Sequence, residues 1–123
     1  VKYPQNADQD WIEIRLADVI LLYAEALNEN NNTTAALVEL NKVRARAGLD
    51  NSTASTQTDV RTAIQDERRL ELAFEGHRWF DLVRTGTVSA EMGQSINPDY
   101  HVFPVPVSEI LATNGVITQN PGY

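Results

Sequence analysis

Three carboxylates recur at intervals of four residues near the middle of the chain, at Glu67, Glu71 and Glu75. Residues four apart lie on one face of an α-helix, so the pattern predicts that these side chains line one side of a helix. Two neighbouring carboxyl groups can act as general acid and general base, as they do in glycoside hydrolysis. Glu67 and Glu71 are the pair that this chemistry would use, and a glycoside-processing enzyme is therefore one function to weigh.

The arginines around these carboxylates favour a structural role instead. Glu67 and Glu71 flank the apolar stripe of the predicted helix, where an unpaired charge would be costly. The predicted ion-pair network consists of Arg44, Arg46, Glu67, Glu71, Glu75, Arg78 and Arg84. Within it we expect Arg44 and Glu71 to belong to one partly buried cluster between helix pairs. Carboxylates that alternate with arginines on one helix, away from any loop, indicate packing, so we assign no catalytic residue.

Other kinds of chemistry lack the residues that they require. The two histidines, His77 and His101, do not show the i, i+4 spacing of a zinc-binding helix, so we predict no metal site. The sequence contains no cysteine, no nucleophile elbow, no P-loop and no dinucleotide-binding glycine pattern. We therefore expect no cofactor.

Aromatic side chains can stack on the apolar face of a sugar. The candidates for ligand binding are Trp11, Tyr100 and Tyr123. Trp11 precedes the first predicted helix, and the two tyrosines lie in irregular segments, where binding residues concentrate. Trp79 is predicted instead to pack in the core beside Phe80.

Helical periodicity indicates which elements position these residues. Apolar residues at helical spacing predict a first helix over residues 11–28, with apolar side chains on two faces. A second helix is predicted from Thr33 or Thr34 as N-cap to residue 47, with Gly48 as the left-handed residue that ends it. The short polar loop between the two predicts an antiparallel hairpin.

Two further helices carry most of the charged residues. The third is predicted over residues 58–74, with its first or second residue as N-cap and with Leu70 and Phe74 in its apolar stripe. A short fourth helix is predicted between the glycines at 76 and 86. Its expected buried residues are Trp79, Phe80 and Val83.

The character of the chain changes after Gly86. Residues 89–94 predict one helical turn, and residues 108–113 predict a short helix. Residues 100–106 alternate aromatic and apolar side chains but include two prolines, which predicts extended chain outside a central strand. The sequence thus predicts a mostly α fold of antiparallel helix pairs with an irregular, Pro-containing C-terminal segment.

The bulk composition excludes several classes of function. The chain has 123 residues, 42% of them hydrophobic, and a formal net charge of −7. This acidic balance disfavours nucleic acids and anionic membrane surfaces, both of which need clustered Lys and Arg. No apolar run reaches the length of a membrane span. We expect residues 1–123 to form a single domain, or a fragment of a longer protein.

Four ordered blocks of sequence resemble the SusD/RagB family. They are residues 15–28, residues 40–49, residues 67–84 and the C-terminal stretch that holds Phe103-Pro104-Val105-Pro106 and residues 119–123. The block at 67–84, which reads ERRLELAFEGHRWFDLVR, is the most specific of the four. Together the blocks span nearly the whole chain.

The resemblance implies tetratricopeptide-like helix pairs in the C-terminal region of a lipid-anchored protein on the outer-membrane surface. Such proteins capture glycans or other nutrients, deliver them to a SusC-like TonB-dependent transporter and catalyse nothing. This region would serve mainly as helical scaffold and transporter-docking part, because most sugar-binding aromatics of the family lie upstream of these blocks. The alternative is a helical-repeat adaptor that binds a protein partner without any glycan. We further expect the isolated chain to self-associate or to be marginally stable, since its first helix is apolar on two faces.

Overall fold

In the computed structural model, residues 12–123 are described and their regular structure is helical. The elements are α1 (Leu16–Glu29), α2 (Thr33–Arg46), α3 (Gln57–Glu71), α4 (Arg78–Thr85), α5 (Val88–Met92), the 3-10 helix η1 (Pro98–His101) and α6 (Val107–Ala112). No strand occurs between residues 12 and 123, which confirms the predicted mostly α fold. The chain forms two compact units, residues 1–76 and residues 77–123.

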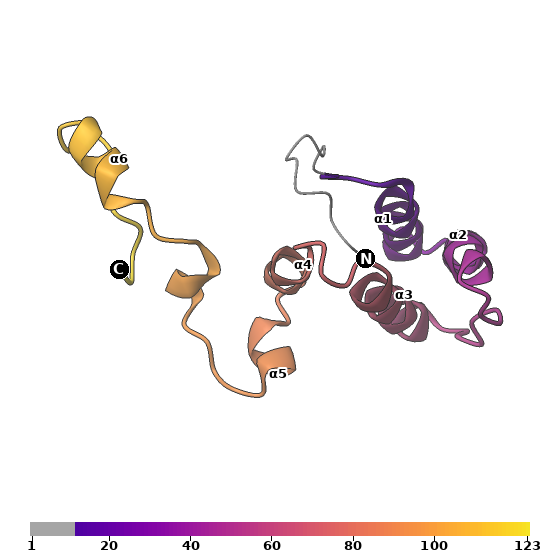
Figure 1. Ribbon diagram of the computed structural model, residues 1–123. Coiled ribbons are helices and arrows are strands. Elements are labelled where there is room, and N and C mark those ends of the chain that lie inside the picture. Colours follow the sequence, from indigo (N-terminus) through magenta and orange to yellow (C-terminus); the bar gives the residue numbers. More distant parts are fainter. Residues whose placement is uncertain (1–11) are drawn as a thin grey trace. The chain divides into compact units, whose positions relative to one another are not determined.

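The first unit contains α1, α2 and α3, which lie side by side (Figure 1). A short loop joins α1 to α2, as expected for an antiparallel hairpin, and α3 packs against both helices. The core is made of side chains that are almost completely buried: Leu21, Ala24, Ala36, Leu40, Val43, Val60 and Ile64. The two alanines allow α1 and α2 to approach closely, while the larger side chains of α2 and α3 fill the space between the helices.

The start of α3 lies earlier than predicted. Thr56 is the N-cap, because its hydroxyl accepts a hydrogen bond from the Asp59 backbone N–H at 3.1 Å and the Asp59 carboxylate accepts one from the Thr56 N–H at 3.4 Å. Thr58 and Asp59, the predicted caps, therefore lie inside the helix. The two hydrogen bonds between Thr56 and Asp59 form a capping box. Of Thr56 and Thr58, only Thr56 has an acidic residue three positions later that can complete one.

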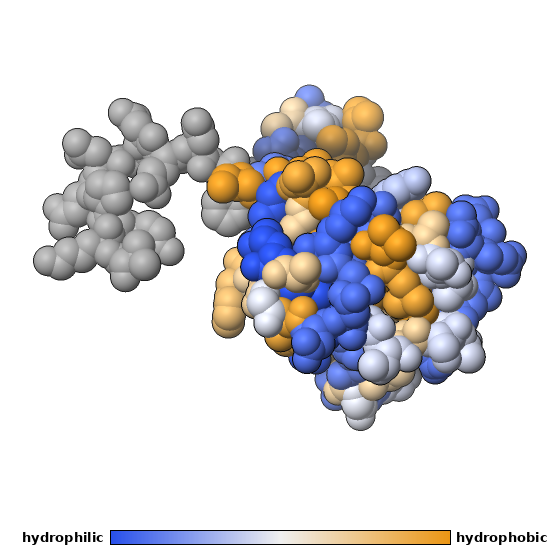
Figure 2. Space-filling model, turned by 90° about the vertical axis from the view of Figure 1, so that its right-hand side faces the viewer, coloured by the Kyte–Doolittle hydropathy of each residue, from blue (hydrophilic) through white to orange (hydrophobic). Residues whose placement is uncertain are grey.

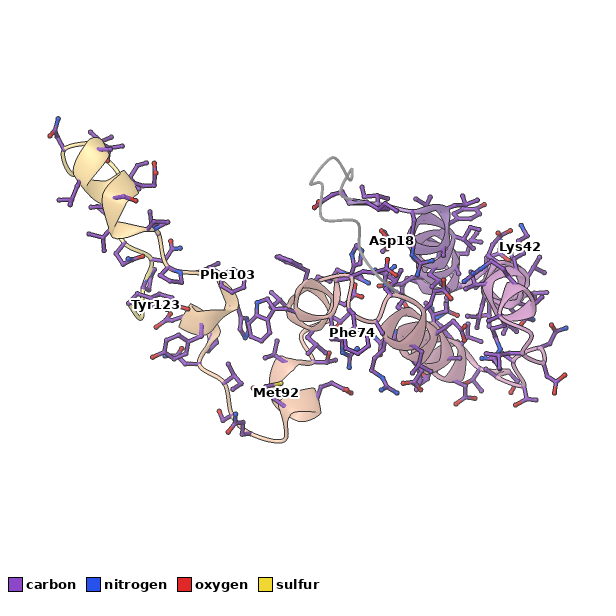
Figure 3. The ribbon with its side chains drawn as sticks, viewed as in Figure 1. Asp18, Lys42, Phe74, Met92, Phe103 and Tyr123 are labelled. Atoms are coloured by element: carbon purple, nitrogen blue, oxygen red, sulfur yellow. The ribbon has the colours of Figure 1, made fainter. Side chains whose placement is uncertain are left out.

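The end of α3 also differs from the prediction, which continued the helix to Phe74. The helix stops at Glu71, and Phe74 and Gly76 both adopt left-handed backbone conformations, with φ of 67° and 83°. Leu70 is 62% exposed and Phe74 is fully exposed, so neither belongs to the buried stripe of α3 in this chain. Figure 3 marks Phe74 in the turn that follows α3.

A buried amide joins the end of α1 to the start of α3. The Asn28 side chain, which has no solvent exposure, donates to the Gln57 carbonyl at 2.9 Å, and the Gln57 side chain donates to the Asn28 carbonyl at 2.7 Å. The Thr33 hydroxyl at the start of α2 donates to the Asn28 side-chain oxygen at 3.2 Å. One polar side chain therefore holds the ends of three helices together, and its hydrogen bonds offset the cost of its burial.

Replacing Asn28 by leucine should lower the free energy of unfolding by about 1–3 kcal/mol, because the partly buried Gln57 carbonyl and Thr33 hydroxyl lose their partner. Urea denaturation followed by circular dichroism measures the loss. The matched control is Asn30→Ala, because that exposed amide donates only to the Ala26 carbonyl of its own helix. Equal effects of the two variants would show that the buried bonds contribute nothing beyond ordinary surface amides.

The second unit contains α4, α5, η1 and α6. Its buried apolar side chains are Leu82 of α4 and Val88 of α5, not the predicted set of Trp79, Phe80 and Val83. Phe80 is 63% exposed, and Trp79 meets His101 edge to face with ring centroids 6.4 Å apart. The prediction failed because a helix of eight residues can bury few side chains on any one side. In α4 the side chain on the buried side is Leu82.

The C-terminal tail, residues 119–123, runs along the extended segment that follows η1. The Gln119 side chain accepts from the Val105 N–H at 2.7 Å and donates to the Val105 carbonyl at 2.9 Å. The Asn120 side chain donates to the Phe103 carbonyl at 2.7 Å. Side-chain amides thus hold this irregular part of the chain in place. Between residues 12 and 123, no helix has the combination of length and apolar character that crossing a membrane requires.

Candidate functional site

The predicted carboxylate cluster lies at the C-terminal end of α3, where α1 and α2 each supply arginines. Arg44 of α2 donates to the Glu67 carboxylate at 2.8 Å. Arg46, at the end of α2, pairs with Glu71. Arg15, just before α1, donates to Glu71 at 2.5 Å and to Glu75 at 2.7 Å.

Arg15 also closes the end of α3. Its guanidinium donates to the backbone carbonyl of Glu71, a group that has no partner inside the helix because α3 stops there. The hydrogen bond to Glu75, and then the one to Glu71, raise the pKa of Arg15 above its ordinary value, against an opposing effect of burial. A permanent cation at the C-terminal end of a helix is also favoured by the helix dipole.

The burial and ion pairing of Glu67 and Glu71 disfavour their use as a general acid and general base. The side chains of Glu67 and Glu71 are only 5% and 9% exposed, and an arginine contacts one oxygen of each carboxylate. A general acid or base must come within hydrogen-bond distance of a reacting atom. The arrangement therefore supports ion pairing between helices.

The second unit presents the aromatic candidates. Tyr100 and Tyr123 pack edge to face, with ring centroids 5.6 Å apart, and the Tyr123 hydroxyl donates to the Val102 carbonyl at 3.1 Å. Phe103 follows in the extended segment, and all three rings are exposed to solvent. Figure 3 marks Phe103 and Tyr123 near the C-terminal end of the chain. We call Tyr100, Phe103 and Tyr123 the aromatic corner.

Gly122 makes the packing of the aromatic corner possible. It adopts a φ of 90°, and a Cβ at this position would lie 3.0 Å from the Asp99 Cβ and 3.3 Å from the Tyr100 ring. The backbone can approach the tyrosine closely only because glycine has no side chain. The Asn97 side chain meanwhile accepts from the Asp99 N–H at 3.1 Å, so polar groups border the rings. Trp11, the third aromatic candidate, lies outside the described residues.

A family model described as the SusD family matches residues 2–101. The chain belongs to the SusD family. Two curated relatives from Formosa agariphila are SusD-like protein P2, 31% identical over 97% of this chain, and SusD-like protein P25, 38% identical over 96% of it. The match covers only 27% and 26% of these two relatives, so the chain spans about a quarter of their length.

Solved structures show the same helical arrangement. A SusD homolog from Bacteroides thetaiotaomicron superposes with a TM-score of 0.79 at 34% identity, over 90% of this chain and 25% of that one. A laminarin-binding SusD-like protein superposes with a TM-score of 0.70 at 44% identity, over 89% of this chain and 22% of that one. The tetratricopeptide-like fold expected from the sequence is thereby confirmed.

Two arginines of the network predicted for this SusD-family chain have partners inside the second unit. The structure pairs Arg78 with Glu91 at 2.7 Å and Arg84 with Asp81 at 2.9 Å. An i, i+3 partner on the same helix is always within reach, which favours Asp81 for Arg84. Arg44 likewise contacts Glu67, while Glu71 receives Arg15 and Arg46.

A deeply buried ion pair between α1 and α3 was missed by sequence reasoning. Arg68 of α3 and Asp18 of α1 are 4% and 8% exposed, and the Arg68 guanidinium donates to the Asp18 carboxylate at 2.7 Å. The same guanidinium nitrogen also donates to the Asp18 carbonyl at 3.3 Å. A signal was present, because Arg68 continues the spacing of Val60 and Ile64 at intervals of four, which places it on the buried side of α3. Among residues 12–123, no group of three or more metal-binding side chains gathers.

Proposed function

We propose that this chain is the C-terminal helical region of a SusD-like protein that captures a glycan at the outer-membrane surface for a SusC-like TonB-dependent transporter. Its first unit acts as a helical scaffold. Membership of the SusD family and the 44% identity to a laminarin-binding SusD-like protein support this proposal. The surface location, the lipid anchor and the transporter partner belong to the complete protein.

One observation favours binding over catalysis: the carboxylates are enclosed by arginines, whereas aromatic rings are exposed. A sugar ring presents C–H groups on its faces and hydroxyls at its edge, and it therefore suits an exposed aromatic ring with polar neighbours. The aromatic corner offers this combination, with Tyr100 and Tyr123 beside Asp99. We propose it as a secondary glycan contact of the complete protein.

Tyr100→Ala should weaken the binding of a glycan such as laminarin to the complete protein by about tenfold, equivalent to 1.4 kcal/mol. Isothermal titration calorimetry measures the change. Tyr23→Ala is the matched control, because Tyr23 is a similarly exposed tyrosine that belongs to α1 of the first unit. If both variants bound glycan as tightly as the unaltered protein, the aromatic corner would not be a glycan contact.

The exposed apolar residues of α1 favour the alternative function, a helical-repeat adaptor that binds a protein partner. Affinity purification of the complete protein from native membranes distinguishes this adaptor function from glycan capture and delivery. Recovery of a β-barrel transporter in near-equal amount would support capture and delivery. Recovery of a soluble protein partner without a barrel would favour the adaptor. The enzyme alternative requires that Glu71→Gln abolish glycan processing while leaving the melting temperature unchanged.

A further inference from the structure

Asn114 and Gly115 form the turn that follows α6, and they are the only asparagine–glycine pair in the sequence. Both residues are exposed, and both have left-handed backbone conformations, with φ of 50° and 81°. Asparagine tolerates this conformation better than most residues with a side chain, which suits it to the end of a helix. An exposed side-chain amide therefore precedes a glycine in the turn that closes α6, which Figure 1 labels near the C-terminus.

The amide of Asn114 and the backbone nitrogen of Gly115 can react with each other. The nitrogen loses its proton to hydroxide and attacks the Asn114 Cγ, so that a new C–N bond closes an imide ring. The bond from Cγ to the side-chain nitrogen breaks, and this nitrogen takes a proton from water and leaves as ammonia. Water then opens the ring, either at Cγ to give aspartate or at the main-chain carbonyl to give isoaspartate. The overall change is the hydrolysis of an amide, so it needs no oxidant or reductant.

Gly115 offers little resistance to closure of this ring. Glycine has no Cβ that would hinder the approach of its nitrogen to Cγ. Among the described residues, apart from the chain neighbours, no heavy atom lies within 4 Å of the position that a Cβ of residue 115 would occupy. Asn97 and Asn120, by contrast, are each followed by proline, whose nitrogen carries no hydrogen to lose. The sequence and the surroundings therefore single out Asn114 for this reaction.

The cap of α6 holds the attacking nitrogen while it is closed. The Gly115 N–H donates to the Ile110 carbonyl at 3.2 Å, and the Asn114 N–H donates to the Leu111 carbonyl at 3.1 Å. These two hydrogen bonds form a Schellman motif with Asn114 as its left-handed residue. The Gly115 nitrogen can reach Cγ only when this motif opens, because the hydrogen bond to Ile110 fixes its position.

α6 is short and has little to keep its cap closed. It has six residues, and none of them is buried. A helix of this length is marginal by itself, and a segment with few buried contacts opens locally at a small cost in free energy. We propose that Asn114 is a site of spontaneous deamidation and that the opening of the α6 cap sets the rate.

Both products weaken the start of the C-terminal tail. Aspartate places a negative charge at the C-terminal end of a helix, where the helix dipole disfavours it. Isoaspartate adds a methylene group to the main chain, which the Schellman motif cannot accommodate. The cap leads directly into the tail, because the Ile117 N–H donates to the Thr113 hydroxyl at 3.2 Å. Deamidation therefore loosens residues 116–123, which include Tyr123 of the aromatic corner.

Incubation of the complete protein in mildly alkaline water enriched in heavy oxygen tests the proposal, because the water that opens the imide leaves its oxygen in the product. Mass spectrometry of peptides then locates the label. Asn51 is the matched internal control, since it is exposed and the N–H that follows it is also held, by a hydrogen bond from Ser52 to the Asn41 side chain at 2.9 Å. Unlike Gly115, Ser52 has a Cβ. Asn51 belongs to the first unit, and Figure 2 shows one face of that unit, where apolar patches interrupt a mostly hydrophilic surface.

A variant separates the effect of deamidation on the tail from other effects of incubation. Asn114→Gly removes the amide and keeps a residue that suits the left-handed position of the cap. Hydrogen exchange of residues 116–123 should become faster in the incubated protein and should stay unchanged in the Asn114→Gly variant after the same incubation. Unchanged exchange in a protein labelled at residue 114 would overturn the proposed loosening of the tail.

Residue 114 of the folded protein should take up the label about tenfold faster than Asn51, because only Asn114 precedes a glycine. Uptake at residue 114 should be about tenfold slower in buffer than in concentrated urea, where the cap does not form. Absence of label at residue 114 in the folded protein would overturn the assignment of this site. Equal rates in buffer and in urea would overturn the role of the cap.

Discussion

Asp18→Ala should destabilise the first unit by about 3–5 kcal/mol, because it removes a buried carboxylate to which the Arg68 guanidinium donates at 2.7 Å. Arg68 is 4% exposed, so water cannot replace the lost partner. The destabilisation is a large share of the 5–15 kcal/mol that typically stabilises a domain. Chemical denaturation followed by circular dichroism measures the loss, provided that the variant still folds.

A double replacement keeps this prediction testable if Asp18→Ala does not fold. Asp18→Leu combined with Arg68→Met removes both charges and fills the space with apolar side chains, so it should recover most of the stability that the single variant loses. A double variant as unstable as Asp18→Ala would show that the loss arises from packing and not from the lost contact between Asp18 and Arg68. A near-normal melting temperature for the single variant would show that the Asp18–Arg68 pair contributes little.

Glu71→Ala should cost about 3 kcal/mol, because two arginines from different helices lose a shared, mostly buried carboxylate. Arg15 and Arg46 both pair with Glu71, so its removal loosens the start of α1 and the end of α2 together. Differential scanning calorimetry should show a lower melting temperature. An unchanged melting temperature would contradict the interpretation of this cluster as a link between helices.

Glu29→Ala is the control for this comparison. Glu29 pairs with Arg61 between exposed side chains, and such pairs contribute little to stability because water screens them. The hydrogen bond from Arg61 lowers the pKa of the Glu29 carboxyl below its ordinary value. Any stability from this pair is therefore present above the ordinary pKa of a glutamate and is lost as the pH falls through the lowered pKa. The effect of Glu29→Ala should accordingly disappear in acid.

The helices could be predicted because their signals are local. The apolar periodicity that leads from Leu21 to Ala24 and the glycine at position 48 lie within one or two turns of the structure that they specify. The N-cap of α3 was nevertheless predicted at the wrong residue, because it is Thr56 and not Thr58 or Asp59. Two threonines compete for the cap, and the acidic residue three positions after Thr56 decides between them.

The partners of the arginines could not be predicted because they depend on how separate helices are placed. Arg44 and Arg46 lie two residues apart on α2, yet they contact different carboxylates, Glu67 and Glu71. The rotation of α2 about its axis decides this choice, and the sequence spacing of α3 cannot reveal it. Arg15 was overlooked although it lay within the first predicted helix, because its carboxylate partners lie 56 and 60 residues later in the sequence.

Two apolar residues that were predicted to be buried are exposed for a different reason. Leu70 and Phe74 fit a helical stripe in the sequence, but both are exposed in the part of the chain that the structure describes. A hydrophobic pattern records that a residue is buried in the complete fold, and it does not say which segment buries it. The sequence therefore predicted more buried surface than these residues can bury by themselves.

The Gln119 side chain has a consequence for the behaviour of the protein at high concentration. An extended segment with alternating aromatic and apolar residues resembles an unpaired edge strand, which can pair with another chain and begin aggregation. The primary amide of Gln119 occupies both the N–H and the carbonyl of Val105, the two groups that a neighbouring strand would use. With prolines on both sides of Val105, at positions 104 and 106, the segment offers no continuous edge. One side chain near the C-terminus thus protects an extended stretch of an α-helical protein from fibril-like association.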